Sequence, residues 1–135
     1  MFSFHHVSLS VRNLKNSIEF YALFGFKPVF RWQSDDKMLS IVHLKLGQTL
    51  LELFCFENAV AAPASSQQLI TDLPRIGIKH FGIKVADIHA AREALQSIGL
   101  AGGVEVVQGK TGIEYFFIKD PSGILIEVVQ DDRNL

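Results

Sequence analysis

The feature that most constrains this chain is an internal repeat, in which two unlike residue types recur at nearly the same spacing. His6 opens a segment of alternating apolar residues, and Glu52 follows 46 residues later inside the apolar run 50–54. His80 and Glu127 repeat this arrangement with a spacing of 47 residues. Such a repeat indicates that one supersecondary motif is built twice. The sequence therefore predicts two similar modules, each with a histidine near its first strand and a glutamate in its last.

The first repeat predicts the element order β-α-β-β-β. Alternating apolar residues predict a strand over 4–11, and a helix follows over 14–24, with Asn13 as its N-cap and Gly25 as its C-terminal stop. Three further strands are expected over 27–33, 38–46 and 49–56. The residues Leu-Gly-Gln-Thr at 46–49 are typical of a hairpin between the last two strands.

The second repeat predicts the same order. A strand is expected over 79–85 and a helix over 88–98, capped by Asp87 and ended by Gly99. The later strands are expected over 103–107, 113–119 and 124–130, with a turn at 120–123. The fold class is therefore α+β. A single domain over 1–135 would contain module one at about 4–57, a linker at about 58–76 and module two at about 77–130. The linker is interpreted as a connection, with a lid beside the site as the alternative.

Charge and composition argue against nucleic acid and membranes as partners. The chain has 135 residues with 13 basic and 14 acidic side chains, so its net charge of −1 offers no field for nucleic acid or an anionic membrane. A small-molecule substrate is expected instead. The single Cys55 excludes a disulfide within the chain, and neither a secretory signal nor a membrane-spanning run is apparent. These features predict a cytoplasmic protein.

Glu52 and Glu127 are unusual because a carboxylate in a strand interior is rare unless it is paired, protonated or bound to a metal. Together with His6 and His80 they form a set of two imidazoles and two carboxylates. This set suits Zn, Ni, Co, Mn or Fe(II) better than Cu(I). We expect one divalent ion on these four residues, with positions left open for water or substrate oxygens.

Other reactive side chains are expected to lie outside this site. His5 neighbours His6, so strand alternation predicts that it points to the opposite face. His43 and His89 have no counterpart in the other repeat and are interpreted as exposed or core-edge residues. Cys55 is separated from Glu52 by an odd number of residues, so we expect a small buried residue rather than a nucleophile.

Several motifs resemble the glyoxalase/bleomycin-resistance/extradiol-dioxygenase superfamily, also called vicinal oxygen chelate, over about residues 4–130. They are His6-Val-x-Leu-x-Val11, Phe20-Tyr21-x-x-Phe24-Gly25-Phe26, Leu51-Glu52-Leu53, His80-x-x-Ile83-x-Val85 and, most specifically, Asp120-Pro121-x-Gly123-x-x-x-Glu127. The resemblance implies paired βαβββ modules, curved sheets that form a half-open barrel, a metal ion inside it and a homodimer. The modules could pair within one chain or swap between two chains.

The ligand set favours one branch of this family. Extradiol dioxygenases use two histidines and one glutamate, bleomycin-binding proteins keep no metal set, and methylmalonyl-CoA epimerase usually has glutamine where Glu52 stands. Glutamate there is similar to glyoxalase I. The resemblance thus implies a lactoylglutathione lyase-like enzyme with Ni, Co or Zn, in which Glu127 is the base and Glu52 the second acid or base. An epimerase, a ring-cleaving dioxygenase and a drug-binding resistance protein remain alternatives.

The expected substrate face combines polar and apolar residues. We expect Ser8, Ser10 and Lys84 to face the pocket from the two first strands, and Phe54, Tyr115 and Phe117 to form an apolar wall or simply to pack in the core. Glyoxalase I usually carries an arginine for the glutathione carboxylate at the place of Ser10. Lys84, at the matching place in the second module, could supply the charge or indicate a different anionic substrate.

Overall fold

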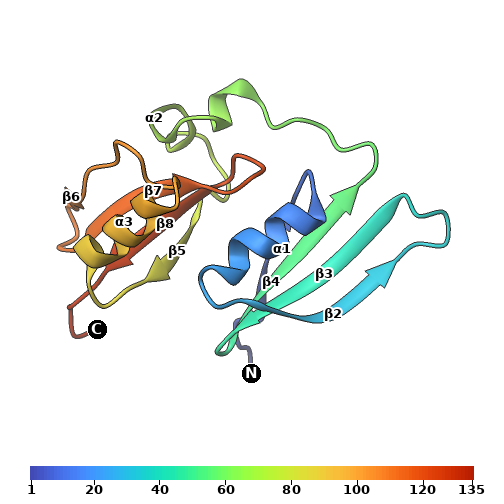
Figure 1. Cartoon of the computed structure of the whole chain (residues 1–135), viewed down its shortest axis with the longest axis horizontal. Helices are drawn as coiled ribbons and strands as arrows, with labels where there is room; N and C mark the ends of the chain where they lie inside the picture. The colour runs from blue at the N-terminus through green and yellow to red at the C-terminus, as the bar shows by residue number, and fades with distance from the viewer. The chain divides into compact units, whose positions relative to one another are not determined.

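The computed structural model of the chain describes residues 1–135. The chain divides into two compact units, Met1–Ala62 and Pro63–Leu135, and each unit contains one four-stranded sheet with helices (Figure 1). None of the helices combines the length and the hydrophobicity that a membrane crossing requires.

The first unit is a βαβββ module. Its elements are β1 (His6–Ser10), α1 (Leu14–Ala22), β2 (Lys27–Gln33), β3 (Leu39–Leu46) and β4 (Thr49–Phe56). The strand order in the sheet is β1-β4-β3-β2. The first strand runs parallel to β4, whereas the β2–β3 and β3–β4 pairs are antiparallel.

The second unit repeats this topology after two short helices. Its elements are η1 (Ala64–Ser66), α2 (Leu69–Asp72), β5 (Phe81–Lys84), α3 (Ile88–Ser97), β6 (Val107–Gln108), β7 (Glu114–Lys119) and β8 (Leu125–Gln130). The strand order is β5-β8-β7-β6, again with the first strand parallel to the last. The predicted α+β class with two βαβββ modules is confirmed. The strands form two four-stranded sheets, one in each unit.

The predicted helix ends are confirmed at both long helices. The Asn13 side chain accepts a hydrogen bond from the Asn16 backbone N–H at 2.9 Å, and the Asp87 side chain accepts one from Ala90 N–H at 2.9 Å. Gly25 and Gly99 adopt φ values of +92° and +81°, a left-handed conformation that glycine tolerates best. The same local rule therefore begins and ends the helix of each module.

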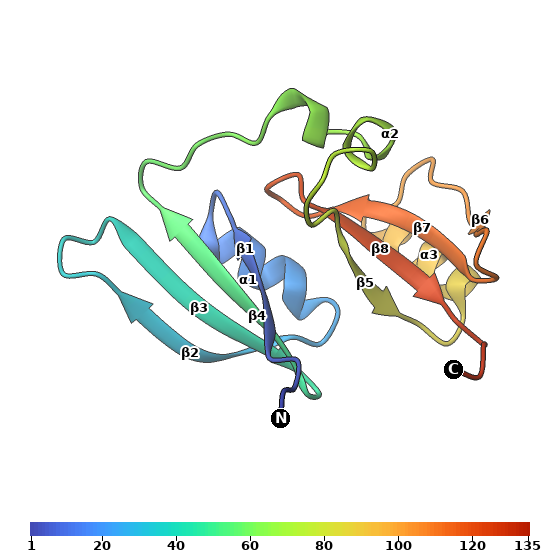
Figure 2. The ribbon, with the colours of Figure 1, turned by 180° about the vertical axis from the view of Figure 1, so that it is seen from behind.

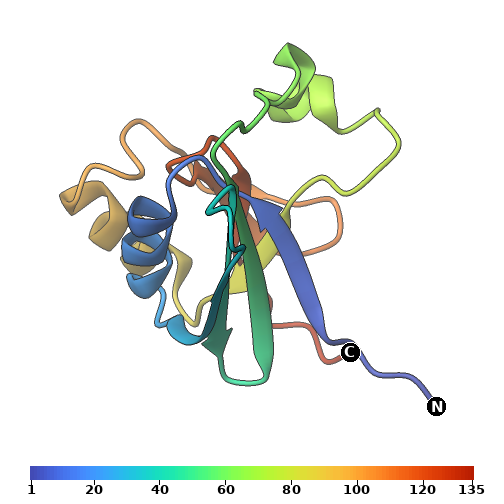
Figure 3. The same ribbon diagram turned by 90° about the vertical axis from the view of Figure 1, so that its right-hand side faces the viewer.

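Each long helix covers one face of its own sheet. Apolar side chains between helix and sheet are buried in both units: Tyr21, Leu44, Leu51 and Leu53 in the first, and Ile88, Phe116, Ile126 and Val128 in the second. In Figure 3, α1 lies on one side of the first sheet. In Figure 2, α3 lies behind β7 and β8 of its own sheet. Because side chains alternate along a strand, residues between the buried ones point toward the helix-free face.

One predicted strand is misplaced. The strand expected over 103–107 is present only as β6 (Val107–Gln108), which pairs with Tyr115 and Glu114. Gly103 takes a left-handed φ of +71° and cannot extend the strand toward its N-terminal side. The Gly-Gly pair at 102–103 is therefore part of the loop after α3.

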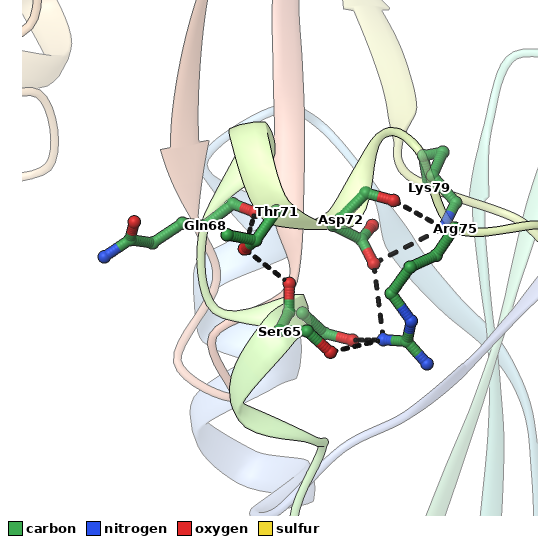
Figure 4. A network of polar contacts seen from close by, with 7 residues as sticks. Ser65, Gln68, Thr71, Asp72, Arg75 and Lys79 are labelled. Atoms are coloured by element: carbon green, nitrogen blue, oxygen red, sulfur yellow. Dashed lines mark hydrogen bonds and ion pairs between the residues drawn. The ribbon is translucent and has the colours of Figure 1, made fainter.

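The segment expected to be a plain linker contains two short helices and a polar cluster within residues 65–79 (Figure 4). Asp72 is buried, with 6% of its surface exposed, and its carboxylate accepts a hydrogen bond from Lys79 Nζ at 3.3 Å. Lys79 also donates to the Asp72 backbone carbonyl at 3.0 Å. Arg75 lies 3.7 Å from the same carboxylate and donates to the hydroxyls of Ser65 and Ser66. The cluster ends at the residue directly before His80.

Candidate metal centre and substrate face

Strand register places the predicted site residues of the first unit side by side. Ser8 on β1 and His43 on β3 are both register partners of Glu52 on β4. Leu51 and Leu53, the neighbours of Glu52, are fully buried beneath α1, so Glu52 points to the helix-free face. Its side chain is 20% exposed. The sequence pattern of a carboxylate between two leucines therefore corresponds to a half-buried acid on the open face of the sheet.

Three side chains contact the Glu52 carboxylate. His6 Nε2 lies 3.3 Å from Oε2, and the Ser8 hydroxyl donates a hydrogen bond of 2.5 Å to the same oxygen. His43 Nε2 lies 3.1 Å from Oε1. The hydrogen bond from Ser8, and after it the one from His43, hold the pKa of Glu52 below its ordinary value, although partial burial opposes this shift. Glu52 is therefore ionised at neutral pH.

His5 contacts His6, contrary to the prediction that it would point away. The Nδ1 atoms of the two rings are 2.8 Å apart, and the rings meet edge to face. The alternation argument fails because β1 begins at His6, so His5 is not part of the strand. A metal ion bound at His6 Nε2 requires the ring proton on Nδ1, and His5 Nδ1 provides an acceptor for that proton.

The second unit contains an equivalent His–Glu pair with fewer polar contacts around it. His80 Nε2 lies 3.4 Å from Glu127 Oε2, with side-chain exposures of 23% and 19%. The His80 ring meets Phe117 edge to face at 4.8 Å, and Phe117 in turn contacts Tyr115. His80 Nδ1 is buried and has no hydrogen-bond partner. Packing against Phe117 orients this imidazole, whereas a hydrogen bond orients His6.

In each pair, the distance between the histidine nitrogen and the glutamate oxygen is compatible with both atoms binding the same divalent ion. Two ligands bound at about 2.1 Å, with right-angled to tetrahedral bond angles, lie roughly 3.0 to 3.4 Å apart. The His6–Glu52 and His80–Glu127 separations of 3.3 and 3.4 Å fall in this range. No group of three or more His, Cys, Asp or Glu side chains is arranged to hold an ion by itself. The four predicted ligands thus occur as two pairs, one in each unit.

The structure distinguishes among the predicted substrate-face residues. The Ser8 hydroxyl is engaged by Glu52, whereas Ser10 and Lys84 are exposed. Phe54 is half-buried and stacks on Phe56, with ring centroids 6.4 Å apart. Tyr115 and Phe117 are also half-buried.

Two other predicted non-site residues have different outcomes. Cys55 lies on the opposite side of the β4 backbone from Glu52, and its thiol donates to the Arg12 carbonyl at 3.7 Å. His43 is wrongly predicted as peripheral, because it lies across from Glu52 and bonds to it. The hairpin at 46–49 contains the missing signal: pairing residue 46 with 49 also pairs 43 with 52.

Comparisons with known proteins identify the family and the fold. The family described as Glyoxalase/Bleomycin resistance protein/Dioxygenase superfamily matches residues 3–128. A glyoxalase family protein from Enterococcus faecalis superposes with a TM-score of 0.77 at 26% identity, covering 94% of this chain and 96% of that one. A comparison with curated protein sequences finds no match.

Two further solved structures share the fold at lower identity. Lactoylglutathione lyase from Agrobacterium tumefaciens has a TM-score of 0.63 at 22% identity, with 95% of this chain and 92% of that chain covered. An E144Q mutant of glyoxalase I from Zea mays has a TM-score of 0.73 at 21% identity, and the match covers 96% of this chain but 45% of that longer one.

Proposed function

The chain belongs to the glyoxalase/bleomycin resistance protein/dioxygenase superfamily, and we propose that it is a metal-dependent lyase or isomerase of the lactoylglutathione lyase type. His6, Glu52, His80 and Glu127 would be the protein ligands of a divalent ion. Ni, Co and Zn suit the donor set best, and Mn and Fe follow. The observation that carries the proposal is the same His–Glu pair in both units, with donor separations of 3.3 and 3.4 Å.

When bound, the ion would supply Lewis-acid chemistry to two neighbouring oxygens of a substrate. The chain's own acids would then move a proton between the two carbons that bear those oxygens. We assign Glu127 as the group that takes this proton, with Glu52 as the second acid or base. Half-burial of both carboxylates limits the access of water to the proton in transit.

The remaining face would orient the substrate. The exposed Lys84 would bind an anionic group, and Ser10, at the matching place in the first unit, would add a neutral hydrogen bond. Phe54, Tyr115 and Phe117 would contact the apolar part of the substrate. Glutathione adducts and adducts of other thiols that bear a carboxylate are therefore the substrates to test first.

The test is turnover of hemithioacetals after removal of bound metal and loading with Ni, Co or Zn. We expect thioester formation with at least one ion. Lys84→Ala should raise KM for a carboxylate-bearing thiol adduct and leave KM for an uncharged adduct unchanged. A protein that binds the ion but shows neither lyase nor epimerase activity would overturn the proposal. A protein that retains no metal would instead favour a drug-binding module.

A further inference from the structure

The two candidate glutamates occupy equivalent places but have different residues across from them. Ser8 and His43 are the register partners of Glu52 on the two neighbouring strands. At the same places around Glu127 the second unit has Gly82 and Phe117. Ser8 and His43 each contact one Glu52 oxygen. Glycine and phenylalanine side chains have no such donor, so Glu127 has only its contact with His80.

We propose that His43, together with Ser8, is a positioning residue that keeps Glu52 a stationary metal ligand, so that Glu127 alone moves to carry the proton. This inference rests on the proposed function and narrows it: Glu52 remains a ligand and no longer serves as the second acid or base. The Glu127 carboxylate takes the proton as the substrate C–H bond breaks, and the resulting carboxyl group returns the same proton to the neighbouring carbon. Glu127 ends in its starting state, and no external oxidant or reductant is needed.

Geometry explains why Glu52 stays in place. To leave a bound ion it must break the hydrogen bonds at both of its oxygens, whereas Glu127 has none to break. A carboxylate only accepts hydrogen bonds, so the proton between Glu52 and His43 lies on His43 Nε2. That nitrogen then has no lone pair for a metal. His43 therefore supports a ligand and is not one itself.

Phe30 packs against His43 in the first unit. The second unit has space for a reciprocal substitution that places a hydroxyl beside Glu127. The Phe30 ring packs against the His43 ring, with centroids 5.3 Å apart. In the other unit, a Cβ atom added at Gly82 would lie 3.8 Å from Glu127 Oε2 and 3.7 Å from Val129 Cγ1, which is ordinary van der Waals contact. Gly82→Ser can thus place a hydroxyl beside Glu127, and His43→Phe makes the first unit match the second.

Co(II) binding by the whole chain, followed by its visible absorption, tests the anchoring directly. Loss of a residue that orients a metal ligand typically lowers affinity about 10- to 100-fold. We expect His43→Phe to weaken Co(II) binding by about tenfold or more, and His43→Gln, which keeps a donor, to weaken it less. His89→Phe on the exposed surface of α3 is the matched control and should bind like the wild type. In the metal-free protein, nitrogen NMR should show the His43 proton on Nε2.

Kinetics of Gly82→Ser provide a second, independent test. Anchoring Glu127 should lower kcat about tenfold with little change in KM, while Co(II) binding is retained. Equal Co(II) affinity of His43→Phe and the wild type, or an unchanged kcat in Gly82→Ser, would overturn this inference but not the proposed function. A wild-type chain that binds no Co(II) would overturn the proposed function and this inference with it.

Discussion

The Asp72–Lys79 contact joins the end of α2 to the residue directly before His80. Asp72→Ala removes the carboxylate and leaves the Lys79 ammonium, whose side chain is 17% exposed, with one hydrogen bond to a backbone carbonyl. A hydrogen bond to a charged group contributes about 1.5–3 kcal/mol, and breaking a buried ion pair costs about 3–5 kcal/mol. Because Lys79 keeps a carbonyl partner, we expect a loss of about 2 kcal/mol in the free energy of unfolding.

Urea denaturation followed by far-UV circular dichroism measures this loss. Arg75→Ala is the matched control, because the Arg75 side chain is 46% exposed and such pairs contribute at most about 1 kcal/mol. Asp72→Ala/Lys79→Met should recover part of the loss, since it leaves no unpaired cation. An Asp72→Ala variant within about 0.5 kcal/mol of the wild type, the range of ordinary surface substitutions, would refute the reasoning. So would an Arg75→Ala variant that loses as much.

Three further changes test the site, the core and the C-terminal charges. Glu127→Gln should retain the bound ion by elemental analysis but lose turnover of hemithioacetals; a variant with normal kcat would contradict its assignment as the base. Leu51→Ala, at a fully buried position, should lower the free energy of unfolding by about 2–5 kcal/mol, and a thermal melt equal to that of the wild type would contradict this packing. Hydrogen bonds from Arg133 hold the pKa of Asp131 below its ordinary 3.8. The pair therefore stabilises the folded state fully above pH 3.8, and this stabilisation is lost as the pH falls through the lower pKa of the folded state. Arg133→Gln should return the pKa of Asp131 toward 3.8 in a carboxyl NMR titration, and an unchanged titration would show that the pair does not form in solution.

Local rules predict most of the fold because the two modules obey them independently. Asn13 and Asp87 cap their helices as their side-chain chemistry requires, and Gly25 and Gly99 end them. Alternation within 49–56 separates the buried Leu51 and Leu53 from Glu52. These signals lie within a few residues of the feature that they determine, so a single sequence contains them.

The predictions that differ from the structure concern features that depend on contacts between separate segments of the chain. His43 has no counterpart in the other repeat, and only the register of the 46–49 hairpin, extended to residues 43 and 52, places it beside Glu52. The folded linker depends on Asp72 meeting Lys79, seven residues away, which composition does not indicate. The strand predicted over 103–107 requires extended backbone there. Gly103 instead has a left-handed φ, and β6 begins only at Val107.

Metal stoichiometry after chelation and reloading with Ni tests the central claim most directly. If His6, Glu52, His80 and Glu127 act as the proposed ligands of one ion, elemental analysis should find close to one ion per chain in the wild type. His6→Ala and His80→Ala should each lower the bound metal strongly, since each removes a ligand from a different pair. A wild-type chain without metal, or a His80→Ala variant that binds as much as the wild type, would contradict the claim.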